Sequence, residues 1–112
     1  MGTMKILKTD GTQTDEECVD VYEGQSSMRE RLKEIVGGDI EHVHVLYEEK
    51  PAYMVVNETG AVQSPPLPVN KEASHIYHAA SAKREGLTLD QAFNEYPPVH
   101  GDVAVLFDCK VR

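Results

Sequence analysis

Five histidines are the first residues of this chain to consider as ligands of a metal ion. His42 and His44 are two residues apart in a segment that alternates polar and apolar residues, so both imidazoles should lie on one face of a strand. His75 and His78 are three residues apart in a helical pattern and should share a helix face. A zinc site needs three or four converging ligands, and His100 with Asp102 could contribute further ones.

The neighbours of these histidines favour a simpler interpretation. Leu46 continues the face of His42 and His44, and the apolar residues Ile76 and Tyr77 run beside His75. We therefore expect surface or partly buried histidines and predict no metal ligand. Metal binding stays an alternative that the convergence of the five side chains would decide.

Three loops contain residues suited to a small-molecule pocket. The loops are residues 57–60, 64–70 and 96–101, and the last two are rich in proline. Stiff loops lower the entropy cost of binding, and Tyr96 and His100 could stack on a base, with Asn70 near them at the wall of the pocket. The sequence thus allows a site for a nucleotide signal, whereas the alternative is that the prolines only fix two long connections.

The segment from residue 10 to residue 23 carries six carboxylates and no Lys or Arg. These acids are Asp10, Asp15, Glu16, Glu17, Asp20 and Glu23. With a net charge of −8 over the chain, such a surface repels phosphate backbones, which argues against direct binding of nucleic acid. The segment is either a solvated face that promotes solubility or a surface that docks on a basic protein.

Signals for catalysis are missing from the sequence. It contains no G-x-S-x-G motif for a nucleophilic serine. Gly37 and Gly38 come before a strand and do not open a helix, so they are not a phosphate-binding loop. We predict a protein that is not an enzyme, with no catalytic residue and no cofactor.

The two cysteines, Cys18 and Cys109, are far apart in the sequence and form no C-x-x-C motif. Free, mostly buried thiols in a reducing cytosol are the simplest explanation, although the sequence does not tell whether the two side chains meet. No segment has the roughly 18 apolar residues of a membrane span. These observations predict a cytoplasmic protein that does not bind membranes.

Periodicity predicts the elements that must position these residues. Strands are expected at residues 4–8, 13–22, 39–48, 52–56 and 102–107, and helices at 27–36, 70–85 and 88–95. The order ββαββααβ indicates an α+β fold, a mostly antiparallel sheet with two or three helices packed on one face. We expect one domain over residues 1–112, with residues 1–3 a disordered start or an expression remnant, and a possible homodimer paired through residues 52–56 or 4–8.

Local signals support several of these boundaries. Asn70 is a good N-cap, and Thr88 with Gln91 matches the capping box. Leu32 belongs to the apolar stripe of the first helix, which Gly37 should end in the left-handed conformation. The apolar run at residues 102–107 favours a central strand.

Five short motifs in this order resemble one family. They are D-G-T (residues 10–12), L-x-x-I-V-G-G-x-I-E (32–41), V-V-N-E-x-G (55–60), N-x-x-A-x-x-I-Y (70–77) and G-D-V-x-V (101–105). The chain resembles an uncharacterised family of small proteins encoded by phages, plasmids and other mobile elements. It departs from the usual pattern at residues 77–98, which makes residues 78–98 a possible insertion. The resemblance implies a mobile-element accessory protein that handles host defence, and it supplies no catalytic residue to carry over to this chain.

Together these features predict a binding protein. The first hypothesis is that the acids of residues 10–23 bind a host or defence protein with a basic surface and so inhibit or modulate it. The alternatives are a protein that binds or sequesters a nucleotide signal with Asn70, Tyr96 and His100, and a metal-binding protein.

Overall fold

The computed structural model describes residues 2–21, 27–109 and 111, and its elements follow the predicted order ββαββααβ. The elements are β1 (Gly2–Leu7), β2 (Gln13–Cys18), α1 (Ser27–Val36), β3 (Ile40–Tyr47), β4 (Lys50–Asn57), α2 (Lys71–Glu85), α3 (Leu89–Glu95) and β5 (Val103–Phe107). Gly2 and Thr3 pair with β2 as part of β1, so the prediction of a disordered start at these residues is wrong.

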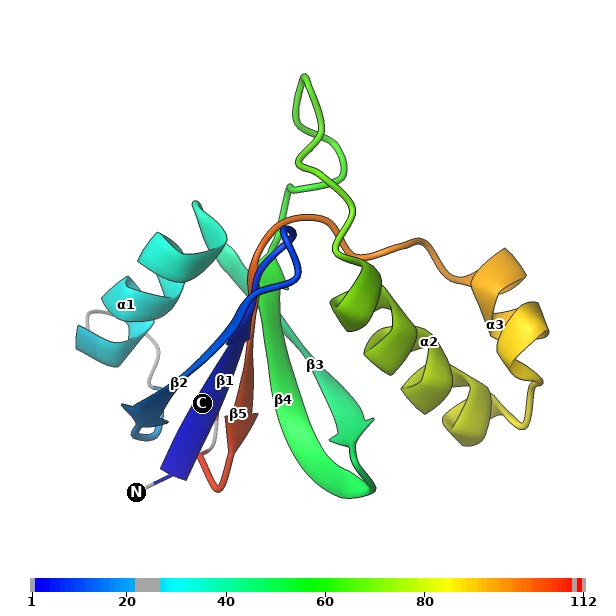
Figure 1. Ribbon diagram of the computed structural model, residues 1–112, viewed down its shortest axis with the longest axis horizontal. Helices are drawn as coiled ribbons and strands as arrows, with labels where there is room; N and C mark the ends of the chain where they lie inside the picture. The colour runs from blue at the N-terminus through cyan, green and yellow to red at the C-terminus, as the bar shows by residue number, and fades with distance from the viewer. Residues whose placement is uncertain (1, 22–26, 110, 112) are drawn as a thin grey trace.

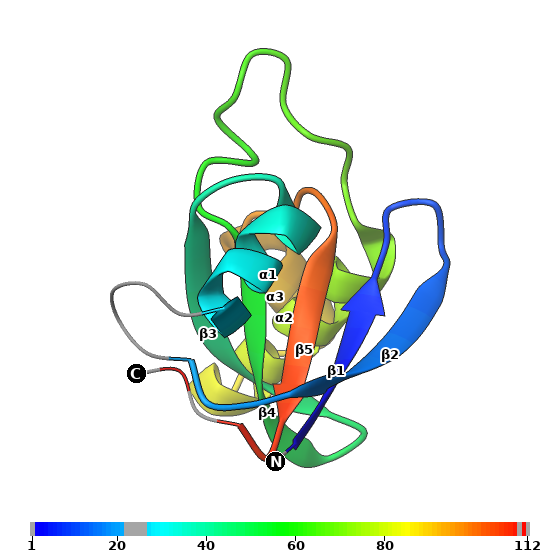
Figure 2. The same ribbon diagram turned by 90° about the vertical axis from the view of Figure 1, so that its left-hand side faces the viewer.

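The strands form one five-stranded antiparallel sheet in the order β2-β1-β5-β4-β3 (Figure 1). β5, the last strand in the sequence, lies between β1 and β4 and joins the two hairpins into one sheet, as Figure 2 shows. The predicted α+β class is confirmed. β1 and β4 are interior strands, so a homodimer cannot pair through residues 4–8 or 52–56, and the two edges of the sheet are β2 and β3.

The helices lie on both faces of the sheet and not on one face as expected (Figure 1). Leu32 of α1 packs with Val55 in one core cluster, whereas Ile76 of α2 packs with Met54 in the other. Met54 and Val55 are neighbours on β4, so their side chains point to opposite faces. α3 packs on α2 and lies farther from the sheet.

β5 is apolar throughout because it is covered on both sides. Its residues Val103 to Leu106 are each 0% exposed. Burying a side chain such as Val or Leu contributes about 1.5–3 kcal/mol, so this strand concentrates a large share of the hydrophobic stabilisation. The predicted central position of the strand is confirmed.

The stretch that begins with α1 folds as its sequence predicts. Leu32 is fully buried, and Gly37 adopts a positive φ of 81° while its N–H donates to the carbonyl of Lys33 at 2.8 Å. This left-handed residue ends the helix. The position before Ser27 lies outside the described part of the chain.

Asn70 is the predicted N-cap of α2, and its side chain also ties three segments together. Its Oδ1 accepts a hydrogen bond from the backbone N–H of Ala73 at 3.0 Å, which confirms the cap. Its Nδ2 donates to the carbonyls of Leu7 at 2.9 Å and Gly101 at 3.0 Å. The side chain is therefore committed to holding the start of α2 against the end of β1 and the approach to β5.

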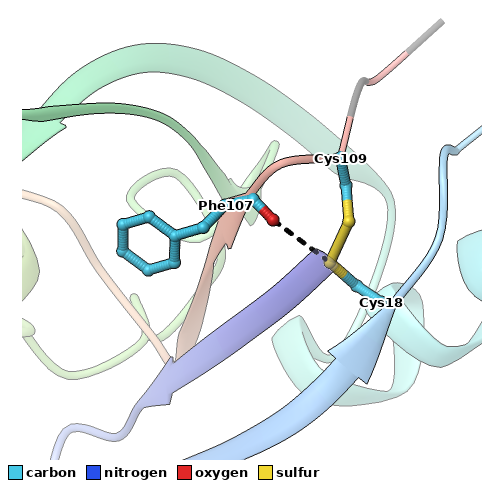
Figure 3. Close-up of a disulfide and its surroundings, with 3 residues drawn as sticks. All are labelled: Cys18, Phe107 and Cys109. Carbon is cyan, nitrogen blue, oxygen red and sulfur yellow. Dashed lines mark hydrogen bonds between the residues drawn. A yellow bond between two sulfur atoms is a disulfide. The ribbon is translucent and has the colours of Figure 1, made fainter. Parts of the chain in front are cut away.

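A disulfide joins Cys18, at the end of β2, to Cys109, just after β5 (Figure 3). Both cysteines are buried, but the prediction of free thiols is wrong, and the argument from free thiols to a reducing compartment no longer holds. Gly2 explains how the bridge forms. It lies opposite Cys18 on the intervening strand β1, where a Cβ atom would collide with Cys109 and the carbonyl of Phe107.

The carbonyl oxygen of Phe107 lies 4.0 Å from Cys18 Sγ, as the dashed line in Figure 3 marks. A disulfide sulfur has no hydrogen to donate, so we regard this approach as a packing contact.

Among the helices of the described residues, none has the length and apolarity needed to cross a membrane.

Replacing Asn70 tests its structural role. We expect Asn70→Ala to lower the free energy of unfolding by about 2–4 kcal/mol, because it removes a helix cap and leaves two buried carbonyls without their donor. Urea unfolding measures the change. Asn94→Ala, at an exposed position of α3, is the matched control and should stay within about 0.5 kcal/mol of the parent. An equal loss in both variants would contradict the role of Asn70.

The disulfide predicts a specific labelling pattern. Denatured protein purified in air should take up no alkylating reagent until it is reduced, and should then gain two adducts, as intact mass will show. Reduction should lower the free energy of unfolding by about 2–5 kcal/mol, since the bridge closes a long loop. The double variant Cys18→Ala/Cys109→Ala should not respond to reductant. Two adducts before reduction would show that the bridge is absent.

Candidate functional site

The acidic residues 10–23 lie mainly on the hairpin that ends in the edge strand β2, and the structure divides them between different surroundings. Glu16 faces α1, where Arg31 Nη2 and Nε donate to its carboxylate at 2.7 Å and 3.1 Å. These hydrogen bonds and the charge of Arg31 lower the pKa of Glu16, and the same pair raises the pKa of Arg31. Glu16 therefore ties β2 to α1 more than it offers a free charge.

Asp15 and Glu17 point to the opposite face of β2, because neighbours of Glu16 on a strand alternate in direction. Both residues are exposed, and the side chain of Asp15 remains 64% exposed although its Oδ1 lies 3.8 Å from Lys5 Nζ. A pair this open contributes little to stability. These two carboxylates are available to a partner.

The remaining predicted acids are Asp10, Asp20 and Glu23, and the two that the structure describes lie in different surroundings. Asp10 caps the β1–β2 turn, where the Thr12 hydroxyl and backbone N–H donate to its Oδ1 at 2.6 Å and 2.9 Å and lower its pKa. Asp20 is half-buried, and Glu23 lies outside the described residues. The five acids within the described residues thus do not form one continuous patch.

The three predicted loops do lie together. The N–H of Leu67 donates to the carbonyl of Gly60 at 2.9 Å, and the N–H of Gly101 donates to the carbonyl of Pro68 at 2.8 Å. His100 Nδ1 lies 2.7 Å from the Leu67 carbonyl. These contacts make the loop cluster an ordered unit.

The predicted ligand residues do not line one pocket in this cluster. Asn70 is 1% exposed, and its side-chain atoms are used within the fold. The ring of Tyr96 packs edge-on against Tyr77, with centroids 5.9 Å apart. Of the three, His100 alone borders the hollow of about 230 Å³ between these loops and β3, which Glu41 and Glu58 also line.

This hollow suits a phosphate ligand poorly. Its volume of about 230 Å³ is below the roughly 300–1,000 Å³ of typical ligand sites. Two carboxylates on its wall repel an anion. The geometry therefore supports nucleotide binding at this place less than the sequence alone does.

The histidines of α2 do not converge on a metal. His75 is exposed, whereas His78 is buried and its Nε2 lies 3.0 Å and 3.2 Å from the carbonyls of Tyr96 and Pro97. Because both neighbours are acceptors, Nε2 carries the proton and fixes the end of α3 to α2. Its Nδ1 is buried and has no hydrogen-bond partner among the described residues.

His42 and His44 do share one exposed face of β3, as predicted. Their ring centroids are 6.3 Å apart, and both rings contact Tyr53 of β4, at 5.7 Å and 4.8 Å. Within the described ranges, no group of three or more His, Cys, Asp or Glu side chains could hold a metal ion. A single chain therefore offers a pair of ligands at this place.

Sequence reasoning missed a larger hollow of about 900 Å³ beside the end of the β3–β4 hairpin. Its lining includes Leu46 and Tyr53 from the sheet, Lys83 and Arg84 from α2, and Asp20. These residues come from distant parts of the chain and share no motif, so no sequence signal could have grouped them.

Comparison with curated proteins and with solved structures gives no match. One family matches residues 4–110, and its description is "Domain of unknown function (DUF3846)". The match covers nearly the whole chain and confirms the predicted membership of an uncharacterised family. The chain belongs to the DUF3846 family.

Proposed function

We propose that this chain is a non-enzymatic accessory protein of phages or other mobile elements that binds a basic surface of a host or defence protein. The mobile-element origin rests on the resemblance of the five motifs. The binding surface that we propose is the acidic edge, defined as Asp15 and Glu17 on one face of β2 together with Asp10 at the turn. The observation that carries this proposal is the exposure of Asp15 and Glu17 on an edge strand.

The acidic edge combines charge with an open strand. Of the residues of β2, only Glu16 and Cys18 are not exposed. Among the described residues, the structure gives Asp15 one ion pair, with Lys5, and gives Glu17 none. Carboxylates in such a position attract a basic surface and speed its encounter, and they repel other acidic proteins.

Acidic side chains on an edge strand can also serve only to prevent sheet-to-sheet aggregation. This alternative explains the same exposure but requires no partner. The two interpretations differ in what they predict for binding. Only binding to a basic surface makes the capture of a particular protein depend on the salt concentration and on the sign of the charge at residues 15 and 17.

A nucleotide ligand is the weaker second candidate. The loops around His100 do contact one another, but the hollow that they border is small and carries Glu41 and Glu58. We therefore rank binding to a basic protein first.

Charge reversal tests this function. The immobilised full chain should retain a host protein from cell extract at about 50 mM NaCl and release it by about 500 mM, because salt screens exposed charges. The variant Asp15→Lys/Glu17→Lys should retain at least about tenfold less of that protein, in line with the coupling of close interfacial charges. Glu72→Lys/Asp90→Lys, at exposed positions of α2 and α3, changes the net charge equally and should bind like the parent.

The captured protein is then purified and its binding to the same three chains is measured directly. If the reversed variant and the parent bind it equally, or if salt has no effect, the acidic edge is not the binding surface. Equal loss in the control variant would mean that only net charge matters.

A further inference from the structure

β3 is the less protected edge of the sheet, with no strand beyond it in the described part of the chain. It runs for eight residues, pairs with β4 along its whole length, and contains no proline or lysine and a single acid, Glu41. β2, at the other edge, is shorter and carries three acids. Proteins usually protect long edge strands with charge, proline or a bulge, because a free edge is a template for another strand.

The hydrogen-bond ladder shows which backbone groups of β3 face outward. The N–H of Glu58 donates to the carbonyl of Asp39 at 2.9 Å, one step beyond the last pair of β3 and β4. Bonded positions alternate along an antiparallel ladder, so every second residue of β3 turns its N–H and C=O to the free edge. These residues are Ile40, His42, His44 and Leu46. Pro51, which has no N–H, lies opposite Leu46, at a position that needs no bond to β3.

The two histidines thus combine an outward backbone with exposed imidazoles. Both rings lie on the face of α1, and Tyr53, which is half-buried between β3 and β5, contacts each of them. The spacing of two residues places both imidazoles on one side of the strand, and their contacts with Tyr53 limit the motion of the rings there. Two imidazole nitrogens would supply half of the ligands of a tetrahedral zinc site, which takes four.

A second copy of the chain would supply the other half. If a twofold axis perpendicular to the sheet passes through Val43, His42 lies opposite His44 of the second copy, and Ile40 lies opposite its Leu46. This register also satisfies the outward N–H and C=O groups of both strands. If the axis passes through His44 instead, His42 lies opposite Leu46 of the second copy. If it passes through His42, His44 lies opposite Ile40. Either shift moves one pair of imidazoles away from the axis.

The distances of this register fit one metal ion. Opposed residues in a bonded pair have Cα atoms about 5.5 Å apart, and residues two apart on a strand are separated by about 6.8 Å. Four imidazoles at the corners of such a rectangle can reach an ion on the axis with Zn–N bonds of about 2.0–2.1 Å. We propose that two copies of this chain pair along β3 and bind one Zn²⁺ between His42 and His44 of each copy.

The ligand set selects the class of metal. Four imidazole nitrogens without carboxylates suit zinc and other late first-row metals, and do not suit Mg²⁺ or Ca²⁺, which prefer oxygen. A single strand pair adds little stability in water, and two ligands hold a metal weakly. The ion and the second copy therefore depend on each other, and the dimer forms only when zinc is present.

Zinc titration of the metal-free full chain tests the proposal. Sedimentation velocity should show a monomer in EDTA and a dimer after half an equivalent of ZnCl₂ per chain. Elemental analysis of the isolated dimer should give one zinc for two chains. One zinc per chain without dimerisation, or a dimer that persists in EDTA, would overturn the proposal.

Histidine variants identify the ligands. His42→Ala and His44→Ala should each weaken the zinc-dependent dimer by at least about 100-fold, since even loss of a group that only orients a ligand costs about 10–100-fold. His75→Ala removes an exposed histidine of α2 and should dimerise like the parent. Thermal unfolding of the metal-free variants confirms that they fold. A dimer unaffected by His42→Ala, or one lost in His75→Ala, would contradict the assignment.

Discussion

The burial of β5 between two hairpins is the constraint on which the rest of the structure depends. β1–β2 and β3–β4 share a sheet only because the last strand pairs with β1 on one side and β4 on the other. Both ends of this strand are fixed by long-range interactions: Asn70 binds the carbonyls of Leu7 and Gly101 at one end, and the disulfide of Cys109 holds the other. Because β5 is apolar on both sides, a helix must cover each face.

This arrangement leaves the two edges as the places where the backbone of the sheet can meet another molecule. β2 carries carboxylates, and one of them, Glu16, anchors the strand to Arg31 of α1 while Asp15 and Glu17 stay exposed. β3 carries the pair of imidazoles from His42 and His44. The proposed functions follow this difference: attraction of a basic protein at one edge, and metal-linked pairing with a second copy at the other.

Local signals in the sequence predicted local structure well. The caps at Asn70 and Thr88 and the end of α1 at Gly37 need only neighbouring residues, and all three are confirmed. Features set by strand pairing were not predictable in this way. The bridge of Cys18 depends on Gly2 in the strand between its partners, and the side chain of Asn70 is occupied by carbonyls that only the folded sheet brings near. The expectation of helices on one face overlooked the consequence of apolar residues on both faces of β4.

Hydrogen exchange of the backbone amides tests most directly whether β5 holds the sheet together. Ala104 to Leu106 are flanked by strands on both sides, so their amides should exchange only through global unfolding and with the highest protection in the chain. Amides on the free edges of β2 and β3 should exchange far faster. If the β3–β4 hairpin stays protected while the amides of β5 exchange, the two hairpins do not depend on the last strand and the account is contradicted.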